Sequence, residues 1–187
     1  MSVTVAKTAG FCFGVRRAVE LAERQAGENG TIYAYGEIIH NMHEIRRLEK
    51  CGVRTAQTLE EIPDGARVLI RAHGVPRAVY RTLEEKNCEV YDATCPFVQK
   101  IHRIADEESR AGRLVVILGS AGHPEVVGIQ GWCGESVVLD GEEQARAFAG
   151  RPENAARPVS VVAQTTVNRA IWNISVGLIK KRCTNLK

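Results

Sequence analysis

One pattern recurs along this chain: a short run rich in β-branched residues, a loop that contains Gly, His or Cys, and then an amphipathic helical stretch. This alternation predicts an α/β fold with a largely parallel sheet, because parallel strands need a helical crossover between them. The strands are expected at residues 31–35, 67–72, 89–92, 114–118, 136–139 and 159–163. The helices are expected to begin near Gly14, Met42, Pro76, Pro96, Pro124, Gly141 and Val167.

The length of 187 residues is enough for one large domain or two small ones. A long polar helix from Pro96 to about Ala111 leads into a new strand after Gly112. We therefore expect two successive small parallel-sheet lobes flanked by helices, covering residues 1–97 and 98–187.

The charge pattern and the short apolar runs argue against two classes of partner, nucleic acid and membranes. The net charge is +3, and Lys and Arg alternate with Glu along the helical stretches, so no basic stripe for nucleic acid is present. Apolar runs stay far below the ~20 residues that span a bilayer, and the N-terminus lacks an apolar signal core. We expect a cytoplasmic protein without nucleic acid or membrane partners.

The chain has six cysteines, and no two of them form a CxxC pair. In a reducing compartment they are either buried structural thiols or metal ligands. Cys12 lies between glycines just before a helix, and Cys95 follows a strand and precedes Pro96, so each could be a ligand, a reactive thiol or a small buried hydrophobe. Structural roles are favoured for the cysteines that do not precede a helix: Cys51, Cys88 and Cys133.

Histidines His40, His73 and His123 follow predicted strands, beside Asn, Gly or Pro. Ligands bind outside the carboxyl ends of the strands in open α/β sheets, so these imidazoles could donate to phosphate oxygens. Each could instead be a helix cap or a solvated side chain. We expect His43 and His102, which fall within predicted helices, to be surface residues.

Two further groups lie at the same predicted edge. Glu125 falls in the first turn of a helix, where it could complement the helix dipole or donate a proton. Thr165 and Thr166 could cap the last helix, or they could present hydroxyls to a substrate.

Six strings occur in order between Gly10 and Thr166: GFCFGV, GEIIHN, RAHGVP, DATCP, GHPE and AQTT. Together they resemble the signature set of the 4-hydroxy-3-methylbut-2-enyl diphosphate reductase (LytB/IspH) family. The resemblance covers the whole chain as the N-terminal two-thirds of such a protein.

This resemblance implies a trilobed, pseudo-threefold α/β architecture that closes around a 4Fe-4S cluster. Three cysteines hold three irons in the family, and the fourth iron is left for the substrate. Cys12 and Cys95 match the first two ligands. The third lies in a third lobe that we expect this chain to lack. Cys183 falls too early to align with it, and we expect this cysteine to be flexible near the chain end. We therefore expect the chain alone to be an incomplete or inactive fragment.

The resemblance also implies roles for the remaining residues. Glu125 and Thr165 would deliver protons, and the allylic diphosphate would be bound by His40, His73, His123, Gln164, Thr165 and Thr166. Electrons would come from a ferredoxin or a flavodoxin, and the products would be isopentenyl and dimethylallyl diphosphate of the non-mevalonate isoprenoid pathway. The alternative is a non-catalytic α/β module that binds phosphate or a metal, with zinc expected for mixed nitrogen and sulfur ligands.

Overall fold

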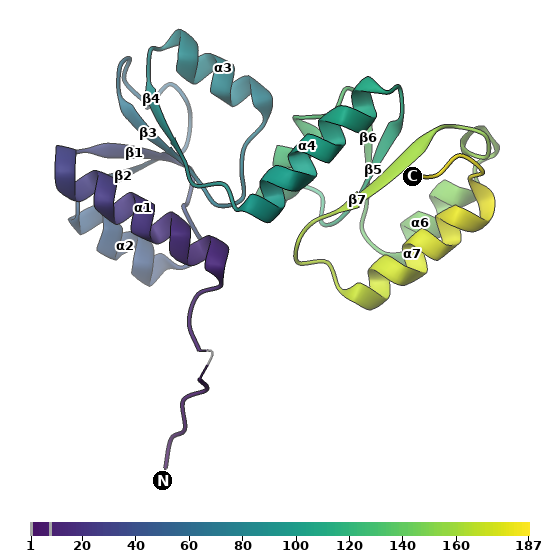
Figure 1. The fold of residues 1–187 in the computed structure, drawn as a ribbon, viewed down its shortest axis with the longest axis horizontal. Coiled ribbons are helices and arrows are strands. Elements are labelled where there is room, and N and C mark those ends of the chain that lie inside the picture. The colour runs from purple at the N-terminus through teal and green to yellow at the C-terminus, as the bar shows by residue number, and fades with distance from the viewer. Residues whose placement is uncertain (1, 8) are drawn as a thin grey trace. The chain divides into compact units, whose positions relative to one another are not determined.

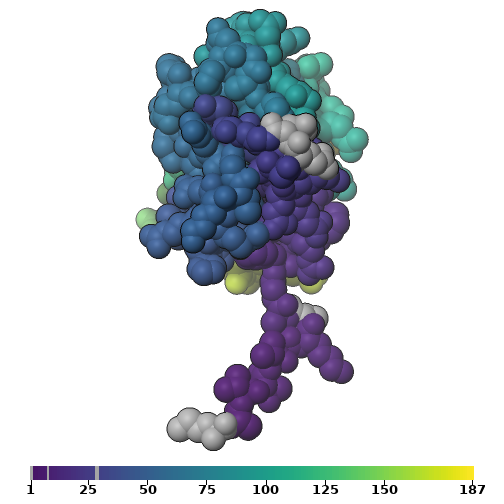
Figure 2. All heavy atoms as spheres, turned by 90° about the vertical axis from the view of Figure 1, so that its left-hand side faces the viewer, coloured from purple at the N-terminus to yellow at the C-terminus, as the bar shows by residue number. Residues whose placement is uncertain are grey.

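The computed structural model describes residues 2–7 and 9–187, apart from the side chains of residues 28 and 29. Residues 2–7 are exposed, and Figure 2 shows the N-terminal segment extending away from the rest of the chain. Across the described part of the chain, no helix has both the length and the apolar character needed to cross a membrane.

The first of two compact units comprises Met1–Ala72 and Lys86–Cys95. It contains a four-stranded, wholly parallel sheet in the order β2-β1-β3-β4 (Figure 1). The strands are β1 (Ile32–Tyr35), β2 (Val53–Ala56), β3 (Arg67–Ile70) and β4 (Glu89–Asp92), and the helices of this unit are α1 (Phe13–Asn29) and α2 (Met42–Lys50). The strand β2 was missing from the prediction.

The helix α1 packs on the first sheet through one face, as its apolar spacing predicts. Its small buried side chains, Ala18, Val19, Ala22 and Ala26, share one core with Ile32 and Ala34 of β1, Leu48 of α2 and Leu69 of β3. These small side chains let the backbone of α1 approach the sheet closely.

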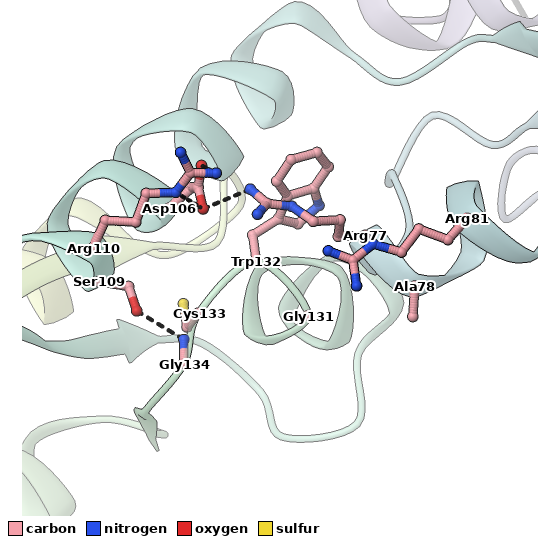
Figure 3. A pocket seen from close by; sticks show the side chains of 10 residues that line it. All are labelled: Arg77, Ala78, Arg81, Asp106, Ser109, Arg110, Gly131, Trp132, Cys133 and Gly134. Carbon is pink, nitrogen blue, oxygen red and sulfur yellow. Dashed lines mark hydrogen bonds and ion pairs between the residues drawn. The ribbon is translucent and has the colours of Figure 1, made fainter.

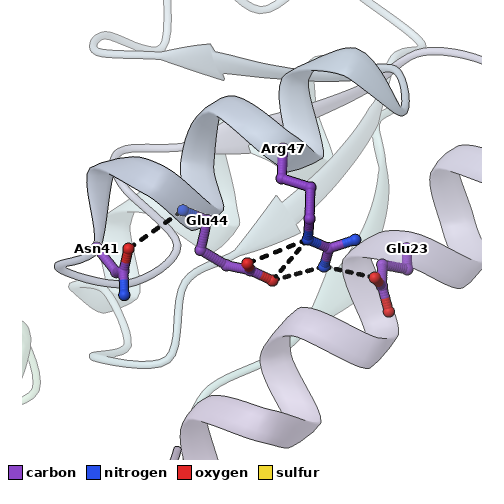
Figure 4. Close-up of polar contacts among 4 residues, drawn as sticks. All are labelled: Glu23, Asn41, Glu44 and Arg47. Atoms are coloured by element: carbon purple, nitrogen blue, oxygen red, sulfur yellow. Dashed lines mark hydrogen bonds and ion pairs between the residues drawn. The ribbon is translucent and has the colours of Figure 1, made fainter.

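The helix α2 has a well-defined start (Figure 4). The Asn41 side chain accepts a hydrogen bond from the N–H of Glu44 at 3.1 Å, which is a standard N-cap. Arg47 pairs with Glu44 on its own helix and with Glu23 of α1, and its guanidinium lowers the pKa of the Glu44 carboxyl. The cap fixes the backbone immediately after His40.

The second unit comprises His73–Glu85 and Pro96–Lys187. Its parallel sheet has the order β6-β5-β7, with β5 (Leu114–Leu118), β6 (Ser136–Leu139) and β7 (Val159–Ala163). Its helices are α3 (Arg77–Glu85), α4 (Pro96–Arg110), α5 (Pro124–Gln130), α6 (Glu142–Gly150) and α7 (Arg169–Arg182), with a 3-10 turn at Pro152–Asn154. The lobe ranges 1–97 and 98–187 stay a prediction. The second compact unit also contains residues 73–85, which the predicted ranges assign to the first lobe.

The central strand β5 is buried on both faces, as expected for a parallel sheet covered by helices (Figure 1). Val115 and Ile117 pack with α4 and α5. Leu114, Val116 and Leu118 pack with α6 and α7. The period-two alternation of one five-residue strand thus supplies both layers of the core.

The two sheets repeat one topology that is not visible as a sequence repeat. In the first unit the leading strand is flanked by the second and third, and the fourth pairs outside the third. In the second unit Leu186 forms a parallel bridge to Val159 of β7, at the position that β4 holds in the first sheet. The N–H of Lys187 donates to the carbonyl of Val159, and the N–H of Val161 donates to the carbonyl of Lys187.

Truncating the buried Ile117 is expected to destabilise the protein by ~2–5 kcal/mol, because Ile117→Ala removes transfer energy and leaves a cavity. The matched change Ile174→Ala, at a side chain that is 45% exposed, should alter the unfolding free energy by only about 0.5 kcal/mol. Denaturant unfolding of both variants measures the contrast, and similar losses would contradict this description of the core.

Candidate active site

Backbone hydrogen bonds join the loops that follow β1, β3 and β4 at the carboxyl edge of the first sheet. The N–H of Ala72 donates to the carbonyl of Ile38 at 3.4 Å, and the N–H of Cys95 donates to the carbonyl of Ala72 at 3.0 Å. Ligands of open α/β sheets bind outside this edge. The chain segments that carry His40 and Cys95 both leave the first sheet here.

His40 is exposed, and its Nδ1 lies 3.4 Å from a carboxylate oxygen of Glu37. A carboxylate partner at Nδ1 favours the tautomer that carries a proton there and fixes the ring orientation. The neighbouring His43 is also exposed, as predicted.

Cys12 directly precedes α1, and Cys95, which directly precedes α4, packs against the first turn of α1. Cys12 is the N-cap residue, exposed, with no capping hydrogen bond from its side chain. Cys95 is half-buried, and its Sγ lies so close to Gly14 that a Cβ added to this glycine would be 2.7 Å away. The sulfur of Cys95 therefore rests on the first turn of the helix that Cys12 caps. A fully buried hydrophobic role does not describe either cysteine.

Arg17 holds α1 to the segment that ends at Cys95, a role that the sequence reading missed. Its guanidinium donates to the carbonyl of Thr94 at 3.1 Å and to the carbonyl of Asp92 at 3.2 Å. The only sequence signal was an arginine next to the apolar face of a predicted helix, and an arginine side chain at such a position is usually solvated.

In the second unit, His123 is the N-cap of α5. Its Nδ1 accepts a hydrogen bond from the N–H of Glu125 at 3.1 Å, so in the neutral ring Nε2 carries the proton. The His73 ring meets the His123 ring edge-on, with centroids 5.6 Å apart. The alternative in which His123 caps a helix is thus confirmed.

Glu125 is a buried carboxylate, only 2% exposed, in the first turn of α5. Its Oε1 accepts the backbone N–H of Thr165 at 2.6 Å, and its Oε2 accepts the Thr165 hydroxyl at 2.9 Å. Thr165 itself is exposed. The pair therefore connects a shielded acid to the surface through a single hydroxyl.

Gln164 organises the loop after β7. Its Oε1 accepts the N–H of Ser120 at 3.2 Å, and its Nε2 donates to the Thr166 hydroxyl at 2.8 Å. A cavity of about 290 Å³ at the carboxyl ends of the second sheet is lined by Gln164 and Thr166. Asn168 caps α7 by accepting the N–H of Ala170, so the alternative in which Thr165 and Thr166 cap this helix is wrong.

Two expectations about other residues are corrected. His102 is buried rather than on the surface, because its ring stacks on Trp132 at 5.3 Å. Cys183 is not a flexible terminal thiol: it is 2% exposed in the core beneath α6 and α7, and burial raises its pKa. Cys51 is exposed after α2, and Cys88 and Cys133 are half-buried.

A second cavity in this unit, of about 400 Å³, contains none of the predicted site residues (Figure 3). Arg77 lies over the Trp132 ring at 4.6 Å and pairs with Asp106, which also pairs with Arg110. The indole N–H of Trp132 donates to the carbonyl of Val75 at 3.0 Å. Arg77 and Arg110 already form ion pairs with Asp106, so this cavity is a weaker candidate for a ligand site.

Alkaline pH is expected to destabilise the fold in part through Cys133, which lines this second cavity. Burial, followed by the nearby Asp106 carboxylate, raises the pKa of the Cys133 thiol from 9.0 to about 11. The thiol's contribution is therefore fully present below pH 9.0 and is lost as the pH rises through about 11. Over that interval the unfolding free energy should fall less steeply in Cys133→Ala than in the wild type or in Cys51→Ala, and equal slopes would contradict the shift.

The sequence is similar to a protein family and to named proteins of several bacteria. The family model described as LytB protein matches residues 3–187. A protein of Clostridioides difficile named 4-hydroxy-3-methylbut-2-enyl diphosphate reductase is 38% identical over 188 residues, which cover 100% of this chain and 66% of the relative. The protein of the same name from Aquifex aeolicus is 40% identical over 184 residues, with 96% of this chain and 62% of the relative covered.

Two solved structures share the fold. The reductase structure from Plasmodium falciparum has a TM-score of 0.88 at 26% identity and covers 97% of this chain and 57% of its own. A structure described as (E)-4-hydroxy-3-methyl-but-2-enyl diphosphate reductase, the terminal enzyme of the non-mevalonate pathway, has a TM-score of 0.83 at 37% identity and covers 99% and 66%. The chain thus spans about two thirds of the length of its relatives, and the family match over residues 3–187 shows that it belongs to the LytB family.

Proposed function

We propose that this chain provides catalytic and substrate-binding residues of a reductase that converts (E)-4-hydroxy-3-methylbut-2-enyl diphosphate to isopentenyl and dimethylallyl diphosphate. The observation that carries the proposal is the buried Glu125, bonded at both oxygens to the exposed Thr165. A buried carboxylate that is hydrogen-bonded to an exposed hydroxyl is suited to proton transfer, whereas binding of phosphate or a metal alone does not require one. The names of the relatives support the same reaction.

The proposed cofactor is a 4Fe-4S cluster with Cys12 and Cys95 as two of its ligands. The residues fit such a group, because soft thiolates select iron-sulfur clusters and Gly14 leaves the space that the Cys95 sulfur occupies. When bound, the cluster supplies single electrons and a Lewis-acidic iron for the hydroxyl group of the substrate.

The diphosphate is assigned to three histidines: His40, His73 and His123. In the neutral His123 ring the donor nitrogen is Nε2, and an imidazole N–H donates well to phosphate oxygens. Gln164 and Thr166 add an amide and a hydroxyl beside the cavity of about 290 Å³. Binding energy from this remote group would position the reacting end of the substrate.

Protons pass through the Glu125–Thr165 pair in this proposal. In the structure the Thr165 hydroxyl donates to Oε2 of Glu125 over 2.9 Å. For the transfer, a protonated Oε2 donates to the Thr165 oxygen instead, and the Thr165 hydroxyl passes its own proton to the substrate. Proton transfer by a positioned side chain contributes typically about 10²–10⁴-fold to a rate.

The electron donor is a ferredoxin or a flavodoxin in this proposal, and the compartment is the cytoplasm. The cysteines of the described chain are free thiols, which suits a reducing compartment.

Anaerobic reconstitution with iron and sulfide tests the cofactor against the module alternative. The protein tested is a chimera in which residues 1–187 replace the matching part of the Clostridioides difficile relative, so that the third cluster ligand expected outside these residues is supplied. The proposal expects brown protein with visible absorption and up to about four irons and four sulfides per chain. Colourless protein that takes up one zinc ion and no sulfide would instead support the metal-binding module.

A further inference from the structure

Gly14 is a glycine for reasons of space rather than backbone conformation. It lies buried in the first turn of α1, in a helical conformation that any residue can adopt. A Cβ added here would lie 2.7 Å from Sγ and 3.1 Å from Cβ of Cys95, and real Cβ atoms essentially never show contacts under 3.0 Å. Glycine is less favourable than alanine in a helix, so the close contact with Cys95 supplies a reason for glycine at this position.

Arg17 lies three residues later, on the same side of α1 as Gly14. Its guanidinium bridges the carbonyls of Asp92 and Thr94, at 3.2 and 3.1 Å. The Asp92 side chain in turn accepts the N–H of Thr94 at 2.8 Å, and Thr94 is fully buried. The backbone immediately before Cys95 is therefore fixed to α1 at a second point.

We infer that Gly14 and Arg17 are positioning residues that hold the Cys95 sulfur on the first turn of α1 and so set its separation from Cys12. Gly14 allows the close approach, and Arg17 fixes the direction from which the Cys95 segment arrives. The first N–H groups of a helix have no partner inside it, so they are available to a bound sulfur. The inference rests on the proposed function in that Cys12 and Cys95 are taken as the paired thiolates.

The test is chemical crosslinking of Cys12 to Cys95 in the full chain, without iron and under anaerobic reducing conditions. Dibromobimane, which bridges neighbouring thiols, is added, and the Cys12–Cys95 adduct is quantified by peptide mass spectrometry. Gly14→Ala is expected to lower the yield about tenfold, the population change that ~1.4 kcal/mol produces. The control Gly27→Ala lies on the same helix, where an added Cβ meets nothing within 4 Å, and it should crosslink like the wild type.

Arg17→Lys is the second variant, in case Gly14→Ala does not fold. Lysine keeps the charge but lacks the planar fork that bridges two carbonyls, so the crosslink yield should again fall. The control is Arg24→Lys, because Arg24 is exposed on the same helix. Circular dichroism and thermal unfolding verify that each variant is folded.

Equal crosslink yields in the wild type, Gly14→Ala and Arg17→Lys would overturn the inference, and so would a wild type that forms no Cys12–Cys95 crosslink. A lower yield in the variants supports it, as does a shifted reduction potential of the cluster in reconstituted Gly14→Ala. The proposed function is judged separately: a wild type that crosslinks but takes up only zinc would refute the cluster while leaving the positioning roles intact.

Discussion

Replacing Glu125 with glutamine is expected to lower turnover of the allylic diphosphate by about 10²–10⁴-fold, the usual contribution of a positioned general acid. Glutamine keeps an oxygen for the N–H of Thr165 but has no acidic proton to pass on. Turnover is measured in a chimera in which residues 1–187 replace the matching part of the Clostridioides difficile relative, with a reduced one-electron dye.

The matched control for this variant is Glu143→Gln. Glu143 is also a first-turn glutamate, but it is exposed on α6 and should be dispensable. Thr165→Val should resemble Glu125→Gln, and Thr165→Ser should restore turnover, since only the hydroxyl relays the proton. Full activity in Glu125→Gln would remove the acid from the mechanism.

In the same chimera, replacing either Cys12 or Cys95 with serine is expected to reduce the iron retained after anaerobic reconstitution from up to about four per chain to nearly none. A serine hydroxyl is a hard donor and a poor substitute for a thiolate in a cluster of iron and sulfide. Iron and sulfide analysis after gel filtration measures the loss. Cys51→Ser, at an exposed cysteine after α2, should keep the wild-type content, and retention of the cluster in both active-site variants would contradict the assignment.

Local sequence signals predicted most of the second sheet. The runs at β5, β6 and β7 are short, apolar and rich in valine, and the structure places these strands at the predicted residues. The helices that start at Pro96 and Pro124 were also predicted correctly, because proline at the first helical position is a strong start signal. The strand β2 was missed, since Arg54 and Thr55 interrupt its four residues.

Pairings between distant residues could not be predicted. His102 was expected on the surface of a polar helix, and its stacking partner Trp132 lies 30 positions later. Cys183 was expected to be flexible near the chain end, but the bridge from Leu186 to β7 keeps that segment against the core. No pattern in either segment alone encodes these contacts.

The residues of the candidate site were predicted from local motifs, but the contacts between them were not. The sequence motifs singled out Glu125 and Thr165, but only the fold shows that they are hydrogen-bonded across 40 residues. The packing roles of Gly14 and Arg17 could not be predicted, because a glycine near a helix start and an arginine on a helix are common. Their contacts with the Cys95 segment depend on how α1 packs on the first sheet.

The most direct measurement is product formation by the unsubstituted chimera, loaded anaerobically with iron and sulfide and supplied with (E)-4-hydroxy-3-methylbut-2-enyl diphosphate and reductant. We expect isopentenyl and dimethylallyl diphosphate to form together, and we expect the Glu125→Gln substitution to lower their rate of formation strongly. A folded chimera that holds its iron and sulfide, binds the diphosphate and yet releases neither product would contradict the proposed reaction.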